Sequence, residues 1–317
     1  MSKVIYTKES KQNLLTYLEQ KEKNKNLGLK IGAEDIDNFL VPLSSSDMMA
    51  VLARPSNGKT SWMIHYAMQA GKSVMLDKQN GITEYAPPIY ITAETPTEEL
   101  SLKVLSNFMH LDSRFIRAGS EELDWQHVKN EVSAMYSEVP LLYSGHSIVN
   151  PRRGLMTIDL IEQSVYDVCD RTGLPPRLIL VDYLQRIASP GNSDRRLGLS
   201  EVVERLKDLH MSVGCPIIFG SQAKREVDDR PFPVPQAGDG KETGSIEETA
   251  DVVISLMRPC KYWSVGSEIP KTSPPRVVTE NLFFVNVLKQ RNGLSDQGFW
   301  MNFDMSVTHL SEMEEIN

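Results

Sequence analysis

The sequence lacks the features of a secreted or membrane-spanning protein. Its 317 residues include only three cysteines, Cys169, Cys215 and Cys260, an odd number at wide spacing. This pattern argues against a disulfide framework and offers no cysteine-based metal site. No apolar run reaches the roughly 18 residues of a membrane span, and the first lysines are not followed by the apolar region of a signal peptide. We therefore expect a globular protein of the cytoplasm without membrane contact.

The chain also lacks an overall basic character. It has 34 Lys and Arg residues against 42 Asp and Glu residues, which gives a net charge of −8. A protein that binds nucleic acid over a broad surface is normally basic, because its cations displace the counterions of the phosphates. Residues 1–30 differ from the acidic remainder of the chain, because they hold seven lysines and three glutamates. Any contact with nucleic acid should therefore be local and made by particular loops.

The order of apolar segments predicts an α/β domain that covers residues 31–317. Short apolar runs typical of buried strands occur at 47–53, 87–94, 177–184, 216–222, 251–258 and 282–290. The first four are separated by segments long enough for crossover helices, which predicts a largely parallel sheet flanked by helices on both faces. The stretch 298–310 alternates apolar and polar residues and predicts an antiparallel hairpin or edge strands. Two segments, 223–244 and 259–281, resemble exposed excursions.

Residues 1–30 form an N-terminal arm in this interpretation. Helix propensity is high over residues 7–24, where Leu14, Leu15 and Leu18 make one narrow apolar stripe. A lysine-rich linker containing glycine follows and marks a boundary. The stripe is too thin for a core helix. It fits either a solvated helix or an arm that docks on another subunit.

The stretch "ARPSNGKTS", which begins at Ala53, matches a phosphate-binding loop except at its first glycine. In such a loop backbone N–H groups cradle phosphates, the lysine reaches the β and γ phosphates, and the following hydroxyl holds Mg²⁺. An apolar strand precedes the loop and a helix-like segment follows it, as the motif requires. The predicted nucleotide-binding residues are Ser56, Asn57, Gly58, Lys59, Thr60 and Ser61.

Three further polar residues end apolar segments that should lie beside the loop. Asp182 follows "LILV" and would hold Mg²⁺ together with Thr60. Glu94 ends "IYITAE" and is the candidate for orienting the attacking water, although a capping or surface role would also explain it. Gln222 closes "IIFGSQ" and could sense the γ-phosphate.

As an ordered set, these strings resemble the RecA-like motor domain of DnaB-type replicative helicases. The resemblance covers about residues 31–304 and rests on the strings "ARPSNGKTS", "ITAE", "LDWQHV", "LILVDYLQRI", "GSQAKREVDDRP", "ETGSIEETADVVISLMR" and "VLKQRNG". It implies a RecA-like P-loop NTPase that forms a ring, usually a hexamer, with ATP and Mg²⁺ bound between subunits. Lys289 and Arg291 would then reach the neighbour's γ-phosphate, Arg291 as an arginine finger.

The resemblance also implies contacts with single-stranded DNA. Lys241, Glu242 and Gly244 match a loop that lines the central channel of the ring and holds the DNA backbone. Further basic residues lie on the loops expected around that channel: Arg225, Arg230, Arg195 and Arg196. Only Phe232 offers an aromatic platform there, so we expect backbone tracking with little sequence preference.

Some features depart from the family. The N-terminal helical collar that meets primase has no room in about thirty residues, so a primase or helicase loader is a partner that the sequence leaves open. Ala53 and the segments 77–88 and 259–281 are atypical and suggest a divergent member, of the kind found in phages or mobile elements.

The function predicted from these residues is that of an ATP-dependent DNA helicase that moves along single-stranded DNA and unwinds duplex. Two alternatives remain open, namely an ATP-switched DNA-binding scaffold or loader and a recombinase-like filament ATPase.

Overall fold

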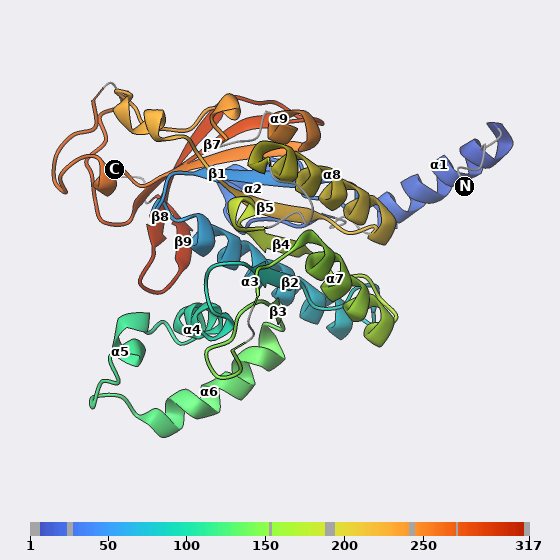
Figure 1. Cartoon of the computed structure of the whole chain (residues 1–317), viewed down its shortest axis with the longest axis horizontal. Helices are drawn as coiled ribbons and strands as arrows, with labels where there is room; N and C mark the ends of the chain where they lie inside the picture. Colours follow the sequence, from blue (N-terminus) through green and yellow to red (C-terminus); the bar gives the residue numbers. More distant parts are fainter. Residues whose placement is uncertain are drawn as a thin grey trace.

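A single mixed sheet runs through the body of the protein (Figure 1). The computed structural model describes residues 7–23, 28–151, 154–187, 194–240, 245–270 and 272–313. Within these ranges the strand order is β3-β2-β4-β5-β1-β6-β7-β8-β9. The strands are β1 (Met48–Ala53), β2 (Ile89–Thr92), β3 (Leu142–Ser144), β4 (Ile179–Asp182), β5 (Ile217–Gln222), β6 (Val252–Met257), β7 (Leu282–Gln290), β8 (Gln297–Asp304) and β9 (His309–Glu312).

The sheet is parallel from β3 to β6 and antiparallel from β6 to β9. β1 lies between β5 and β6 and is buried along its whole length, as a central parallel strand should be. The predicted α/β class, the six strands and the terminal hairpin are confirmed. β3 was not predicted, because it is only three residues long and half-buried at the edge of the sheet.

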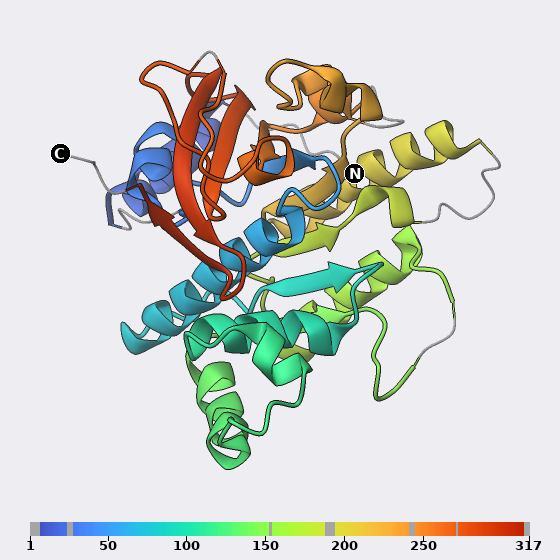
Figure 2. The same cartoon turned by 90° about the vertical axis from the view of Figure 1, so that its left-hand side faces the viewer.

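Helices cover both faces of the sheet (Figures 1 and 2). Alternate residues of β1 face different layers: Met49 and Val51 pack with α3 and α4, whereas Ala50 and Leu52 pack with α7 and α8. The helices are α1 (Thr7–Lys23), α2 (Glu34–Phe39), α3 (Lys59–Gln79), α4 (Thr97–Phe108), α5 (Ser113–Arg117), α6 (Trp125–Glu138), α7 (Ile158–Thr172), α8 (Arg195–Val213) and α9 (Ser245–Thr249). Short 3₁₀ turns lie at Leu184–Arg186, Arg225–Asp229, Ala237–Asp239 and Pro259–Lys261.

The helix α1 projects away from the body of the molecule (Figure 1). Its apolar residues are among the more exposed of the chain, with Leu14 at 57%, Leu15 at 42% and Leu18 at 52%. The predicted N-terminal helix is therefore present, and its apolar stripe has no cover within the described part of this chain. None of the helices in the described ranges is long and apolar enough to span a membrane.

Candidate nucleotide-binding site

The loop between β1 and α3 has the backbone of a phosphate cradle. Ala53 is the last residue of β1, and α3 begins at Lys59 with its N-terminus at the loop. Gly58 has a φ of 84° in the left-handed region, and a Cβ there would lie 2.9 Å from the ring of Phe283. Glycine is therefore required at this position on two counts. Because the first N–H groups of a helix have no intrahelical partner, this end of α3 is suited to binding an anion.

A cavity of about 470 Å³ opens over this loop. The predicted residues that line it are Ser56, Gly58, Lys59, Thr60, Ser61, Glu94 and Gln222. Asn57 departs from the prediction, since it is buried and its side chain is used elsewhere. Its Nδ2 donates to Tyr262 Oη (3.1 Å), and its Oδ1 accepts from the backbone N–H of Arg258 (2.8 Å).

Asp182 lies beneath the cavity at the carboxyl end of β4, as predicted, with 4% of its side chain exposed. It forms an ion pair with Lys59 and accepts hydrogen bonds from Thr60 Oγ1 (2.7 Å) and Tyr90 Oη (2.9 Å). Burial by itself would raise the pKa of Asp182, but the charge of Lys59 and the three donated hydrogen bonds hold it below its ordinary value.

The oxygen donors at this position fit a magnesium ion. The hydroxyl of Thr60 and the carboxylate of Asp182 are in direct contact, and both are the hard oxygen ligands that Mg²⁺ prefers. Tyr90 was missed in the sequence, because it lies inside an apolar strand where an aromatic residue indicates packing. In the structure it is 1% exposed and directs its hydroxyl at Asp182.

Glu94 lines the cavity but does not end a strand, which corrects the sequence prediction. β2 ends at Thr92, whose Oγ1 accepts a hydrogen bond from the backbone N–H of Thr95 (3.0 Å) and turns the chain out of the sheet. The carboxylate of Glu94 is 50% exposed and lies 3.4 Å from Nη2 of Arg186, which follows β4. Arg186 had not been singled out in the sequence.

A buried glutamine joins the ends of β4 and β5. Gln185 accepts the backbone N–H of Gln222 (3.0 Å) and donates to Ser221 Oγ (2.9 Å). Its own carbonyl accepts from Nη2 of Arg195 (3.2 Å). The predicted sensor Gln222 thus has its backbone fixed to the segment that follows Asp182, while its side chain faces the cavity.

Lys103 of α4 is another cavity residue that the sequence did not reveal. Burial lowers the pKa of its ammonium group. No carboxylate pairs with it among the described residues, whereas Lys59 pairs with Asp182 and Arg54 pairs with Asp228 (2.7 Å). A half-buried cation beside a phosphate-binding loop, without a counterion in the described residues, makes the cavity attractive to anions.

Both excursions in the sequence contact the phosphate-binding loop. Arg54 Nε donates to Asp228 (2.8 Å), and the hydroxyl of Tyr262 donates to the other oxygen of that carboxylate (3.0 Å). Tyr262 also accepts from Asn57. The segments 223–244 and 259–281 are therefore tied to the cavity through one polar network.

Lys289 and Arg291 lie at the opposite edge of the sheet. Arg291 forms an ion pair with Asp251 (2.8 Å), whose carboxylate accepts the N–H of Met48 at the beginning of β1. The cavity lies beyond Ala53 at the other end of that strand, about 17 Å away at roughly 3.3 Å per residue. Lys289 donates to the carbonyls of Glu247 and Ala250 (2.5 and 2.9 Å). Neither side chain lines the cavity of its own chain.

The residues predicted to bind DNA are only partly described. Lys241, Glu242 and Gly244 lie outside the described residues. Arg225, Arg195 and Arg196 are exposed. Arg230 departs from the prediction, because both of its terminal nitrogens bind Asp239 (2.5 and 2.9 Å) and brace the loop.

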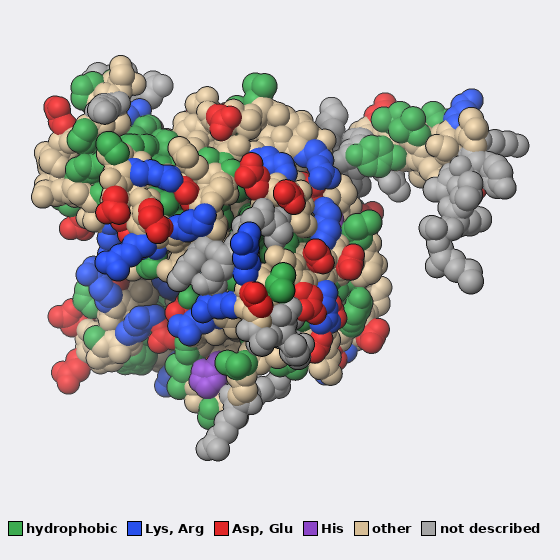
Figure 3. Space-filling model, turned by 45° about the horizontal axis from the view of Figure 1, so that its top comes forward, with side chains coloured by type: hydrophobic (Ala, Val, Ile, Leu, Met, Phe, Trp, Pro, Cys, Tyr) green, Lys and Arg blue, Asp and Glu red, His purple; other side chains and the backbone are tan. Residues whose placement is uncertain are grey.

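Phe232 is also not a free stacking platform. Its ring packs against Phe284 at 5.3 Å between centroids and against two tryptophans, Trp263 and Trp300. On the face shown in Figure 3, Lys and Arg side chains gather toward the left and centre although the whole chain is acidic. Asp and Glu side chains are interspersed among them on the same face.

Comparison with known proteins agrees with this geometry. Residues 28–312 match the model of the DnaB-like helicase C-terminal domain. Curated relatives include the replicative DNA helicases DnaB of Pasteurella multocida strain Pm70 (28% identical, 91% of this chain and 57% of the relative) and Rickettsia bellii strain RML369-C (27% identical, 79% and 48%). The chain thus spans about half the length of the curated relatives it matches.

Solved structures share the fold. One of them, an ATPase domain, has a TM-score of 0.77 at 18% identity, and the match covers 96% of this chain and 98% of that chain. A DnaB-like replicative helicase, studied for its interactions with primase, has a TM-score of 0.74 at 19% identity and covers 96% and 66%. The sheet with its flanking helices is accordingly the RecA-like fold of these ATPases. The chain belongs to the DnaB-like helicase C-terminal domain family, a family of ATP-hydrolysing DNA helicases.

Proposed function

We propose that this chain binds ATP with Mg²⁺ in the cavity over residues 53–61 and hydrolyses it to move along single-stranded DNA and unwind duplex. The observation that carries the proposal is the convergence of Lys59, Thr60, Asp182 and Glu94 on one site at the carboxyl edge of a parallel sheet. Such a site needs a cation for the phosphates, oxygen ligands for a metal, and a carboxylate for water. The cavity offers all three.

Each residue then has one task. Lys59 would turn from Asp182 to the phosphates. Thr60 and Asp182 would hold Mg²⁺, whose charge would stabilise the negative charge that develops on the phosphate oxygens. Glu94 orients the attacking water, and Arg186 fixes the carboxylate of Glu94 from the side. Gln222, anchored by Gln185, registers whether a γ-phosphate is present.

Arg291 completes the site of a neighbouring subunit in this proposal. It cannot reach its own cavity, because the length of β1 separates the two. Its guanidinium is 58% exposed and could meet a phosphate on another molecule. A ring of identical subunits, hexameric by resemblance to the family, would place each Arg291 and Lys289 against the next cavity.

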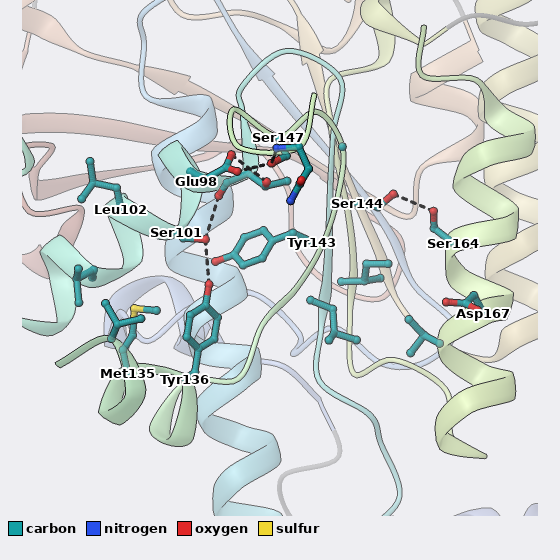
Figure 4. Close-up of a pocket in the computed structure, with 18 of the residues that line it drawn as sticks. Glu98, Ser101, Leu102, Met135, Tyr136, Tyr143, Ser144, Ser147, Ser164 and Asp167 are labelled. Atoms are coloured by element: carbon teal, nitrogen blue, oxygen red, sulfur yellow. Dashed lines mark hydrogen bonds between the residues drawn. The ribbon is translucent and has the colours of Figure 1, made fainter. Parts of the chain in front are cut away.

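The helix α1 supplies a second contact between subunits. A groove of about 890 Å³ lies between α4, α6 and α7 along the outer edge of β3 (Figure 4). Its walls include Leu102 and Met135, and Figure 4 shows Tyr136 and Ser101 joined across it by a hydrogen bond. In Figure 1 α1 lies on the far side of the molecule from this groove, so the groove would receive α1 from a second copy.

Assembly tests this contact. Leu14→Ser, Leu15→Ser and Leu18→Ser together should shift the protein from ring to monomer in sedimentation velocity, and Leu102→Asp should do the same from the groove side. Lys11→Ser in the same helix is the matched control for the arm. Rings that persist in both variants would exclude this contact.

Channel residues of the family suggest the path of DNA. Lys241, Glu242 and Gly244 would hold the DNA backbone, with Arg225, Arg195 and Arg196 as additional cations. A primase or a helicase loader is the class of protein partner that the family suggests.

Steady-state ATP hydrolysis with and without single-stranded DNA tests the proposed motor. We expect stimulation by DNA in the natural chain, little hydrolysis in Glu94→Gln, and separation of a forked duplex by the natural chain alone. Hydrolysis that ignores DNA, with ATP still bound, would favour an ATP-switched scaffold or loader. Stoichiometric coating of DNA as filaments without strand separation would favour a recombinase-like protein.

Mixed rings test the shared site. Lys59→Ala removes a subunit's own cavity lysine but leaves its Arg291, whereas Arg291→Ala does the reverse. Each variant alone should be inactive. Their mixture should regain hydrolysis, because some Arg291→Ala cavities then face an intact arginine. A mixture that stays inactive would contradict hydrolysis at the interface.

A further inference from the structure

Asp251 joins three elements at the edge of the sheet opposite the cavity. Only 3% of its side chain is exposed. Its Oδ2 accepts from the backbone N–H of Met48 (2.9 Å) and from Lys207 Nζ of α8 (2.8 Å), and its Oδ1 lies 2.8 Å from Nη1 of Arg291. Its backbone also takes part, because the N–H of Arg291 donates to the carbonyl of Asp251 (2.9 Å).

These contacts restrict the side chain of Arg291, which is exposed to solvent. A long side chain that is 58% exposed would otherwise sample many rotamers. The carboxylate cannot move with it, since the N–H of a central strand and a helix lysine hold it in place. Its Oδ1 forms an ion pair with one nitrogen of Arg291 without the alignment of a hydrogen bond, so the five N–H donors of the guanidinium remain available to a phosphate.

We propose that Asp251 is a positioning residue for Arg291: it presents the guanidinium to the nucleotide of the neighbouring subunit without touching that nucleotide. The proposal rests on the proposed function, in which Arg291 acts across the subunit interface. A misplaced catalytic group of this kind lowers turnover by up to about 100-fold. Asp251→Asn should therefore lower kcat by about 10- to 100-fold, with little change in KM.

A purely structural role would also lower activity, and mixed rings separate the two explanations. Asp251→Asn leaves the variant's own cavity intact and impairs only what it offers its neighbour. Mixed with Lys59→Ala subunits, which carry an intact Arg291 and Asp251, some Asp251→Asn cavities should regain full turnover. A general folding defect or a defect of the variant's own cavity would give no such gain.

Two variants serve as controls. Asp47→Asn removes a buried carboxylate at the same edge of β1 whose hydrogen bonds, among the residues that the structure describes, go to Ser44, and it should leave turnover unchanged. Lys207→Met removes one of the two groups that hold the carboxylate of Asp251 but keeps the Met48 N–H and the pair with Arg291, so it should lower thermal stability and give a smaller rescuable loss of turnover than Asp251→Asn.

Loss of the buried carboxylate could prevent folding, because Lys207 would then lack its partner. The double variant Asp251→Asn with Lys207→Met avoids that unpaired ammonium, and its reference is Lys207→Met alone. Rescue of the double variant by Lys59→Ala would support the proposal.

The outcomes separate this inference from the function on which it rests. If Arg291→Ala is not rescued by Lys59→Ala, the shared site itself fails. If Arg291→Ala is rescued but neither Asp251 variant is, the shared site stands and the positioning role of Asp251 is wrong. An Asp251→Asn ring with unchanged turnover would overturn the role as well.

Discussion

The ammonium group of Lys59 is ion-paired with the carboxylate of Asp182, 123 residues later in the chain. The pair brings together the first residue of α3 and the last residue of β4, two ends that meet because both β1 and β4 are parallel neighbours of β5. Lys59 therefore has to exchange one anionic partner for another when a triphosphate binds.

Replacing this carboxylate should separate nucleotide binding from metal dependence. In Asp182→Asn, Lys59 loses its anionic partner, so we expect ATP to bind in EDTA at least as tightly as to the natural chain. The added affinity given by Mg²⁺ and the hydrolysis should be lost, because Thr60 then lacks a charged co-ligand. Titration of a fluorescent ATP analogue in EDTA measures the affinity without metal, and the same titration with Mg²⁺ measures the gain in affinity that the metal gives. A variant with the natural Mg²⁺ dependence would remove Asp182 from the metal site.

The hydroxyl of Tyr90 should tune the acid limb of the pH–rate profile. Hydrogen bonds to the charged form keep the pKa of Asp182 low, so removing one donor in Tyr90→Phe raises that pKa. The acid limb of kcat/KM should move to higher pH, while the rate on the plateau changes little. Tyr143→Phe, in the neighbouring strand β3, is the matched control. Identical profiles for the two variants would contradict the role of Tyr90.

Lys103 should strengthen the binding of nucleotide but lower the stability of the nucleotide-free protein. Its lowered pKa means that the folded chain holds the proton less tightly than the unfolded chain. The protonated ammonium group of Lys103 therefore lowers the stability of the free folded protein at neutral pH. This stability rises with pH between the lowered pKa of Lys103 and the ordinary pKa of lysine. Lys103→Met should raise the melting temperature of the free protein and reduce the further rise on adding ATP. Lys129→Met, on the exposed side of α6, should change neither quantity.

Local patterns were sufficient to predict most of the fold. Apolar runs such as 216–222 predict buried strands because each residue must pack, and the loop from Ala53 to Thr60 places the site at the end of a strand. The strand order is set by contacts that are distant in the sequence, so the pairing of β1 with both β5 and β6 could not be derived. Glu94 shows the limit of boundary prediction, since one threonine hydroxyl ends β2 two residues early.

The predicted site residues came from motif positions, and the missed ones lack such a signal. Tyr90 and Gln185 sit in or beside apolar strands and act through hydrogen bonds to residues far along the chain. In the sequence Lys103 is one lysine among many on helical surfaces, and only the folded structure places it, half-buried, at the cavity. The pairing of Arg291 with Asp251 likewise depends on the antiparallel register of β6 and β7.

Acid should destabilise the protein through His65 of α3. This imidazole is buried, and its Nε2 donates to the carbonyl of Ile31 (2.8 Å). Burial lowers its pKa from 6.5 to about 4, so the unfolded chain takes up a proton before the folded chain does. Stability is therefore lost as the pH falls from 6.5 toward 4, and this group alone should cost about 2 kcal/mol between pH 7 and pH 5.

The slope of stability against pH is measured as the difference in the free energy of unfolding in urea between pH 7 and pH 5. His65→Leu should reduce this difference by about 2 kcal/mol, whatever the stability of the variant at pH 7. His127→Leu, at an exposed position on α6, should keep the slope of the natural chain. Equal slopes for the natural chain and His65→Leu would show that His65 does not control the acid response.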